Sequence, residues 1–258
     1  MSPVSRAVFC LLLAFIACDP ARGADRIGVV LLHGKQGHPG GYIAGLVAAV
    51  QAAGYLVEAP EMCWSRNRIY DRPYLGCLSD LDAAVTRLKT RGATAIVVGG
   101  QSLGANAAIR YAATRSGLKG VISLAAGHLP ERMINRPAVA ESMATARAMI
   151  AQGKGKGTAT FADVNEGPIS VSTTPEIYLS FVGPSSPAVI PANAARLKAP
   201  LLWVEGNADR LQLGRSYAFS HAPPNRLNRY VMVSADHLGT PNAARDAVLA
   251  WLKDLSGN

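Results

Sequence analysis

The sequence predicts an α/β protein with a doubly wound, mostly parallel sheet of about six strands. Short apolar runs rich in Val, Ile and Leu recur along the chain, as is typical of strands that are covered on both faces of a sheet. Stretches with helical periodicity separate these runs, and such alternation favours a parallel sheet with helices on both faces. The predicted strands are residues 27–32, 55–58, 95–98, 120–124, 201–205 and 229–233.

Helices are expected between these strands. Ser79 is the expected cap of the second helix, and Gly92 is expected to end it. Thr240 is the expected cap of the last helix, with Pro241 in its first turn. The predicted helices are residues 41–53, 80–91, the stretch after 104, 138–152, 211–219 and the C-terminal stretch from 240.

The alternation stops in one long segment, residues 125–199. This segment contains the helical stretch 138–152, a Gly-Lys-Gly-Lys-Gly run at 153–157, and a piece rich in Pro, Ser and Thr. Because a structureless loop of this length is uncommon in a compact domain, we expect a cap or lid that is inserted into the domain.

The composition is that of a globular enzyme-sized chain. Its 258 residues suit one domain with an insertion, and 49% are hydrophobic while 17% are charged, which argues against intrinsic disorder. The formal net charge is +9, but the Lys and Arg residues are spread along the chain rather than gathered in a stripe. We therefore expect no nucleic-acid partner, and no membrane span after the N-terminal leader.

The N-terminus resembles an export signal. Arg6 precedes the apolar run 8–17, and the small residues of Ala21-Arg22-Gly23 suit cleavage before Ala24. This pattern predicts a signal peptide at 1–23 and a mature domain at 24–258, in the periplasm or secreted. The alternative is a lipoprotein, in which Cys18 becomes the lipidated first residue of the mature chain.

Cysteine usage agrees with export. A mature chain that begins at Ala24 keeps only Cys63 and Cys77, and in an oxidising compartment a disulfide between them is expected. In the chain-entropy description such a bridge contributes about 3 kcal/mol. The alternative is two unrelated buried thiols. The spacing and the lack of partner histidines argue against a metal site, and we expect no cofactor.

The stretch 95–108 has the pattern of a strand, a sharp turn and a helix around Gly100-Gln101-Ser102-Leu103-Gly104. This is the G-x-S-x-G pattern that lifts a nucleophilic serine above the end of a strand. Glycines are needed at both ends of the turn, because a Cβ at either would collide where strand and helix approach each other. The helix that follows directs its free N–H groups toward an anion that forms at Ser102.

A nucleophilic serine needs a base, and the base needs an orienting acid. Asp209 follows the predicted strand 201–205, and His237 follows the predicted strand 229–233. In an open α/β sheet, ligands bind outside the carboxyl ends of the strands, which is where both residues fall. The chain order Ser102, Asp209, His237 is also that of a known class of hydrolases.

With these residues the chain resembles the α/β-hydrolase superfamily, in particular its esterases and lipases. The resemblance covers residues 27–124 and 200–255, and leaves the long insertion uncovered. It implies Ser102 as nucleophile, His237 as general base and then acid, and Asp209 as the orienting acid. It also implies an oxyanion hole from the backbone N–H groups of Leu103 and Lys35. The first two strands of the family have no counterpart, so we expect a reduced fold.

Several neighbouring groups compete for these roles. Glu205 is the best substitute for Asp209, whereas Asp236 is expected to be structural. His33 and His38 are expected to shape the oxyanion loop, and His128 and His221 have no motif around them. The side chain of Lys35 could lend charge to an oxyanion, although its N–H is the preferred assignment.

The loop 63–77 follows the carboxyl end of a predicted strand. Its aromatic residues Trp64 and Tyr70 are therefore candidates for the edge of the substrate cleft, and Arg66 and Arg68 would suit an anionic group on the substrate. The alternative is a solvated loop that the disulfide fastens for stability.

Together these patterns predict a serine hydrolase that cleaves a small-molecule carboxylic ester through an acyl-enzyme. An amidase, a peptidase or an acyltransferase could use the same three residues, and a noncatalytic binding protein on a hydrolase scaffold is a further alternative. Tyr178 and Phe181 of the insertion could line an acyl pocket or fill the core of the cap. The sequence leaves the oligomeric state open.

Overall fold

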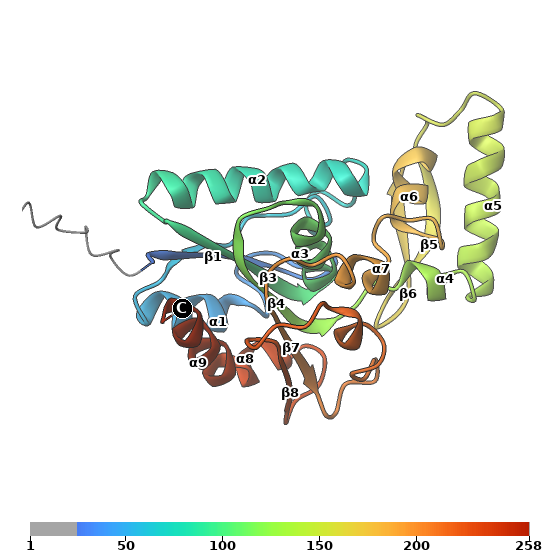
Figure 1. Cartoon of the computed structure of the whole chain (residues 1–258). Helices are drawn as coiled ribbons and strands as arrows, with labels where there is room; N and C mark the ends of the chain where they lie inside the picture. Colours follow the sequence, from blue (N-terminus) through green and yellow to red (C-terminus); the bar gives the residue numbers. More distant parts are fainter. Residues whose placement is uncertain (1–24, 258) are drawn as a thin grey trace, which may run out of the picture.

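A computed structural model describes residues 25–257 and shows a parallel sheet between two layers of helices (Figure 1). The order of the sheet within this range is β2-β1-β3-β4-β7-β8, and every neighbouring pair in it is parallel. The predicted fold class is confirmed. The strands are β1 (Ile27–Leu32), β2 (Leu56–Glu58), β3 (Ala95–Ser102), β4 (Leu118–Ala126), β7 (Leu201–Gly206) and β8 (Arg229–Val233). The predicted leader and the alternative at Cys18 lie outside the described residues.

The two faces of the sheet are covered by different helices (Figure 1). α2 (Tyr74–Thr90) and α3 (Leu103–Thr114) lie on one face, and α1 (Ala44–Ala52), α8 (Thr240–Ala243) and α9 (Arg245–Ser256) on the other. Successive strand residues point to opposite faces, so β1 sends Val30 into the core under α2 and Val29 into the core over α9. Both side chains are fully buried, which is why the strands are almost wholly apolar.

Two predicted helix boundaries are wrong for local reasons. α2 begins at Tyr74 rather than after Ser79, because Pro73 stands at its N-cap with a φ of −58° and Tyr74 is already buried. Thr240 is the first residue of α8 rather than its cap, and its hydroxyl donates to the carbonyl of Asp236.

The predicted helix 211–219 is also wrong. Only a short 3-10 turn, Phe219–His221, is present in that stretch. Gly214 has a φ of +73°, and such a left-handed residue interrupts a right-handed helix.

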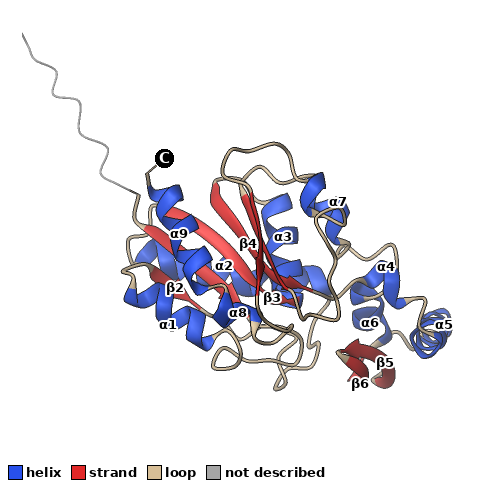
Figure 2. Ribbon diagram, turned by 90° about the horizontal axis from the view of Figure 1, so that it is seen from below, coloured by secondary structure: helices blue, strands red, loops and turns tan. Residues whose placement is uncertain are grey.

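The segment between β4 and β7 is structured throughout and lies beside the carboxyl ends of the sheet strands (Figures 1 and 2). β5 and β6 pair as an antiparallel hairpin whose single-residue tip is Glu166. Tyr178 and Phe181 are fully buried: the ring of Tyr178 stacks on Phe161, and the ring of Phe181 stacks on Tyr70. The elements are α4 (Pro130–Met133), α5 (Pro137–Ala151), β5 (Ala159–Asn165), β6 (Gly167–Thr173), α6 (Pro175–Phe181) and α7 (Ile190–Ala194).

The expected disulfide joins Cys63 and Cys77, whose Cα atoms are 5.5 Å apart. It fastens the loop after β2 to the first turn of α2. No helix in residues 25–257 combines the length and the apolar character that crossing a bilayer requires.

Candidate active site

The three predicted catalytic residues meet at the carboxyl edge of the sheet. Ser102 ends β3, Asp209 follows β7, and His237 follows β8. Because the strands are parallel, their carboxyl ends share one edge. Two pockets open there, with volumes of about 310 and about 710 Å³, and both are lined by Ser102 and His237.

The backbone at Ser102 has the sharp geometry that the glycine pattern predicts. Its φ is 57° and its ψ is −120°, a region that residues with a Cβ adopt only when the surroundings enforce it. A Cβ on Gly100 would lie 2.6 Å from the carbonyl carbon of Gly104, and one on Gly104 would lie 2.5 Å from the carbonyl oxygen of Leu32. Both glycines are thus required by the close approach of β3, α3 and β1.

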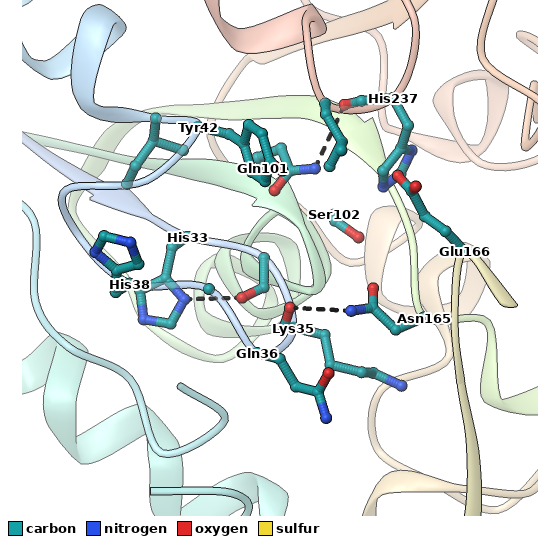
Figure 3. Close-up of a pocket in the computed structure, with 14 residues that line it drawn as sticks. His33, Lys35, Gln36, His38, Tyr42, Gln101, Ser102, Asn165, Glu166 and His237 are labelled. Carbon is teal, nitrogen blue, oxygen red and sulfur yellow. Dashed lines mark hydrogen bonds between the residues drawn. The ribbon is translucent and has the colours of Figure 1, made fainter. Parts of the chain in front are cut away.

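Ser102 and His237 are neighbours in space. A Cβ placed on Gly127, just after β4, would lie 2.6 Å from Ser102 Oγ and 3.5 Å from His237 Cε1. In Figure 3 the hydroxyl of Ser102 lies in the pocket between the His237 ring and the tip of the β5–β6 hairpin. Position 127 therefore requires a glycine, because any side chain there would fill the space beside the hydroxyl of Ser102.

Asp209 is hydrogen-bonded to the imidazole of His237. The Nδ1 of His237 lies 2.8 Å from Asp209 Oδ2, with side-chain exposures of 13% and 5%. If Nδ1 carries the proton that this contact requires, Nε2 is left free to accept one. Burial raises the pKa of Asp209, but the hydrogen bonds from His237 and from the N–H of Leu211 outweigh it, so the net pKa is lowered. Asp209 therefore stays ionised under ordinary conditions.

The two predicted oxyanion N–H groups belong to segments that flank Ser102. Leu103 is the first residue of α3, and the first N–H groups of a helix have no partner within it. Lys35 follows Gly34, where a Cβ would lie only 3.2 Å from Ser102 Cβ. The carbonyl of Lys35 accepts a hydrogen bond of 3.4 Å from the side chain of Asn165 (Figure 3), which fixes the far side of the same residue.

The side chain of Lys35 is committed elsewhere. Its Nζ lies 2.7 Å from Asp163 Oδ1 and donates to the carbonyl of Val164 at 2.7 Å. Tyr70 donates to the other oxygen of Asp163 at 2.8 Å. Burial raises the pKa of Asp163, but the Lys35 ammonium, His128 and the hydrogen bonds from Lys35 and the N–H of Val164 together outweigh it, so the net pKa is lowered. The ammonium thus links the loop after β1 to the β5–β6 hairpin, and does not point at an oxyanion.

The competing acids have structural partners. Glu205 accepts hydrogen bonds from the indole of Trp203 at 2.8 Å and from the hydroxyl of Tyr230 at 2.8 Å. Asp236 accepts from the N–H of Gly239 at 2.7 Å, which fixes the turn into α8. Neither carboxylate is paired with His237 in the described part of the chain.

The other histidines hold backbone or line the pocket. The Nδ1 of His33 contacts the carbonyl of Gly34, and its Nε2 accepts from the N–H of Met62, so His33 joins the loop after β1 to the loop after β2. His38 lines the 310 Å³ pocket. The Nε2 of His128 lies 2.8 Å from the carbonyl of Phe181, and burial lowers the pKa of His128 to about 3. His221 ends the 3-10 turn.

Trp64 and Tyr70 are not placed at the pockets. Trp64 is fully buried and its indole donates to the carbonyl of His33 at 3.0 Å. Tyr70 is 2% exposed and bonded to Asp163. Neither residue lines the two pockets at Ser102. The disulfide holds their loop against α2, and both rings pack in the hydrophobic core. Arg68 is likewise engaged, with Asp71 and Asp80.

Other pocket residues were not predicted. Asn165 and Glu166, at the tip of the hairpin, line both pockets, and Gln101 lines the smaller one. A partial signal for the hairpin exists: apolar and polar residues alternate in 169–172, as they do in half-buried strands, whereas the adjacent apolar residues Phe161 and Ala162 break the alternation in 159–165. In residues 25–257, no group of three or more His, Cys, Asp and Glu side chains is arranged to hold a metal ion.

Comparison with known proteins defines the class of fold. No known family profile and no curated protein matches this sequence. Solved structures do match: DcsB, in complex with its substrate analogue, has a TM-score of 0.71 and 13% identity over 92% of each chain. One of the metagenome-derived lipolytic enzymes LipS and LipT has a TM-score of 0.62 and 16% identity, over 91% of this chain and 95% of its own. An extracellular α/β-hydrolase from a Paenibacillus species has a TM-score of 0.54 and 14% identity, over 89% and 98%. The chain therefore has the α/β-hydrolase fold.

Proposed function

We propose that this protein is a serine hydrolase that cleaves a carboxylic ester through an acyl-enzyme on Ser102. The observation that carries the proposal is the hydrogen bond between His237 and Asp209 beside a serine held at a φ of 57°. The likeness to lipolytic enzymes supports the choice of an ester. The glycine at 127, which leaves room beside the hydroxyl, supports a reacting carbonyl at that place.

The reaction proceeds in two halves. His237 Nε2 takes the proton of the Ser102 hydroxyl as Oγ attacks the carbonyl carbon, and the tetrahedral oxyanion is stabilised by the N–H groups of Leu103 and Lys35. Collapse breaks the bond to the alcohol oxygen, which leaves with the proton from His237. Water, deprotonated by His237, then attacks the acyl-enzyme. Collapse breaks the bond to Ser102 Oγ, which takes the proton back from His237, and the acid is released. Asp209 stays ionised throughout and holds the imidazole in the required tautomer.

Labelling with a fluorophosphonate tests the nucleophile directly. We expect one adduct on Ser102 in the intact protein, detected by peptide mass spectrometry, and loss of both label and esterase activity in Ser102→Ala. Hydrolysis of p-nitrophenyl acetate, compared with the matching anilide, separates an esterase from an amidase. Labelling that persists in Ser102→Ala would remove Ser102 as nucleophile.

We propose further that residues 125–199 act as a cap over the site. The tip of the β5–β6 hairpin lines both pockets, and this arrangement supports the proposal. Replacing Asn165 and Glu166 together by glycine should change the preference among esters of different acyl length while leaving reactivity toward a small fluorophosphonate intact. An unchanged preference would contradict a cap role.

The disulfide between Cys63 and Cys77 supports a working place in an oxidising compartment. We propose that the protein is exported and acts in the periplasm or outside the cell. Thiol alkylation of protein taken from its native host tests this, because export predicts that neither cysteine reacts until a reductant is added. Rapid alkylation of both would contradict it.

A further inference from the structure

The two pockets at Ser102 differ in charge. Arg132, Arg136 and Arg210 line the larger pocket, whereas no arginine lines the smaller one. The first two come from α4 and the N-cap of α5, and the third directly follows Asp209. Arginines from two segments far apart in the sequence thus line the same cavity.

These guanidinium groups lack carboxylate partners. The side chains of Arg136 and Arg210 form no hydrogen bond or ion pair with any residue that the structure describes. Arg132 is held by an aromatic ring instead, since its guanidinium carbon lies 4.6 Å from the ring centroid of Tyr217. The Tyr217 hydroxyl donates to Glu131 at 2.6 Å, which fixes the ring. One arginine is therefore preorganised and two are available to a ligand.

The acids in the same pocket have other partners. Asp209 is bonded to His237, and Asp236 accepts from the N–H of Gly239. The fourth cation of the lining, Lys35, is matched by Asp163 behind the pocket. Glu166 is the lining carboxylate without such a partner among the described residues. Because Asp209 and Asp236 are held by these hydrogen bonds, the charged side chains of the larger pocket that remain open to a ligand are the arginines and Glu166.

The remainder of that lining is largely apolar. Leu129, Met133, Val164 and Leu211 contribute to it, while all three arginines are exposed. A ligand that fits has an apolar portion near Ser102 and an anion toward the mouth. Guanidinium groups prefer carboxylates, because their paired N–H donors match the two oxygens.

We propose that the substrate is an ester that carries a carboxylate on a short apolar chain, and that Arg136 and Arg210 bind this carboxylate. The proposal rests on the function proposed for Ser102. It places the reacting carbonyl at Ser102 and the charge in the larger pocket. The carboxylate can belong to the acid part, as in a half-ester of a dicarboxylic acid, or to the alcohol part.

Paired esters test the charge and locate it. One pair is the p-nitrophenyl ester of glutaric acid and that of monomethyl glutarate. The other is the acetyl ester of 4-hydroxybenzoate and that of its methyl ester. We expect a higher kcat/KM for the charged member of one pair, and the pair that shows it tells which part of the substrate carries the charge. Added NaCl should reduce the preference, because exposed charges are screened.

Matched variants test the residues. Arg136→Gln and Arg210→Gln should each lower kcat/KM for the charged ester by about three- to fivefold, the scale of an exposed ion pair, and leave the neutral ester unchanged. Arg147→Gln is the control, because Arg147 is an exposed arginine on α5 outside both linings. Equal rates for charged and neutral esters, unaltered by the pocket variants, would overturn the proposal.

A binding measurement separates this proposal from the proposed function. Glutarate titrated into the Ser102→Ala protein, followed by calorimetry or NMR, needs no turnover. Binding that weakens in Ser102→Ala with Arg136→Gln and Arg210→Gln supports the anion site even if no ester is cleaved. If esters are cleaved at Ser102 but glutarate binds no better than pentanol, the anion site is wrong and the hydrolase proposal stands.

Discussion

Two aspartates are hydrogen-bonded to basic side chains near the pockets, and their surroundings differ. Asp209 lies 2.8 Å from His237 at the wall of the pockets, where the side chains are 5% and 13% exposed. Asp163 lies 2.7 Å from Lys35 behind the pockets, where the side chains are 0% and 3% exposed. The distances are alike, but the basic partners differ: His237 is an imidazole with a second ring nitrogen that can accept a proton, whereas Lys35 is a buried amine whose pKa burial lowers and Asp163 raises in part.

The difference shows how one kind of contact can serve two purposes. The pair at the pocket wall can change its protonation during turnover, because its histidine faces Ser102. The pair behind the pocket joins two segments of backbone, since Lys35 lies in the proposed oxyanion loop and Asp163 lies in β5. The first pair should therefore control the chemical step, and the second should control stability and the placement of an N–H group.

Asp209→Asn should have the largest effect on catalysis. An asparagine keeps the shape but favours the wrong tautomer of His237, and in a well-studied triad the equivalent change lowers kcat by about 10⁴-fold. The free energy of unfolding should change far less. Steady-state kinetics and thermal unfolding of the same preparation test this prediction. A variant with nearly full activity would show that Asp209 does not orient the base.

Asp163→Asn should have its largest effect on stability. The change leaves the Lys35 ammonium buried and unpaired, which typically costs about 3–5 kcal/mol. Replacing both partners, as in Lys35→Met with Asp163→Leu, should recover much of that loss, because no uncompensated charge remains. Urea unfolding measures both. If the single variant unfolds like the wild type, the pair does not fasten the hairpin to the oxyanion loop.

The same contrast shows what the sequence could predict. Asp209 and His237 each follow a long apolar strand, and parallel strands carry such residues to one edge of the sheet. Ser102 lies in a recognisable motif, and the structure shows that a Cβ at either glycine of this motif would collide with neighbouring backbone. For these residues a local pattern was enough to predict both the element and the edge.

Asp163 had no comparable signal. It lies in a half-exposed hairpin strand, and its partner Lys35 is 128 residues away. Arg136 and Arg210 line the same pocket although they are far apart in the sequence. Such pairings depend on how an insertion folds back on the sheet, and no local periodicity encodes that. The start of α2 at Tyr74 was likewise not predicted, because the sequence around it reads as a loop rich in aromatic residues.

Removing the disulfide should weaken the Lys35–Asp163 pair, and with it stability, more than the His237–Asp209 pair and catalysis. The N–H of Tyr70 donates to the carbonyl of Cys63, and its hydroxyl bonds Asp163, so a looser loop weakens that network. Cys63→Ser with Cys77→Ser should lower the free energy of unfolding by about 3 kcal/mol. Activity at low temperature should be largely retained. Greater loss of activity than of stability would mean that the loop acts directly on the pocket.

Lowering the pH should reveal the contribution of His128, which lies near the Lys35–Asp163 pair, to stability. Burial and, to a smaller extent, the Lys35 ammonium lower the pKa of His128 to about 3, although Asp163 and the hydrogen bond with Phe181 raise it. In the unfolded chain the ordinary histidine pKa is about 6.5. Between these values the unfolded state binds the extra proton, so stability falls as the pH falls, by on the order of 1.4 kcal/mol per pH unit.

The pKa values of Asp163 and Asp209 are lowered in the folded protein. A carboxylate with a lowered pKa loses its contribution to the free energy of unfolding only as the pH falls through the folded value, so these two contributions are lost at lower pH than that of His128. Unfolding in urea at pH 7, 6, 5 and 4 should therefore show a slope that flattens in His128→Gln. Asp209→Asn should keep the wild-type slope over the same range. If His128→Gln leaves the slope unchanged, the acid sensitivity belongs to other groups, of which His33, with a pKa that burial also lowers, is the next to replace.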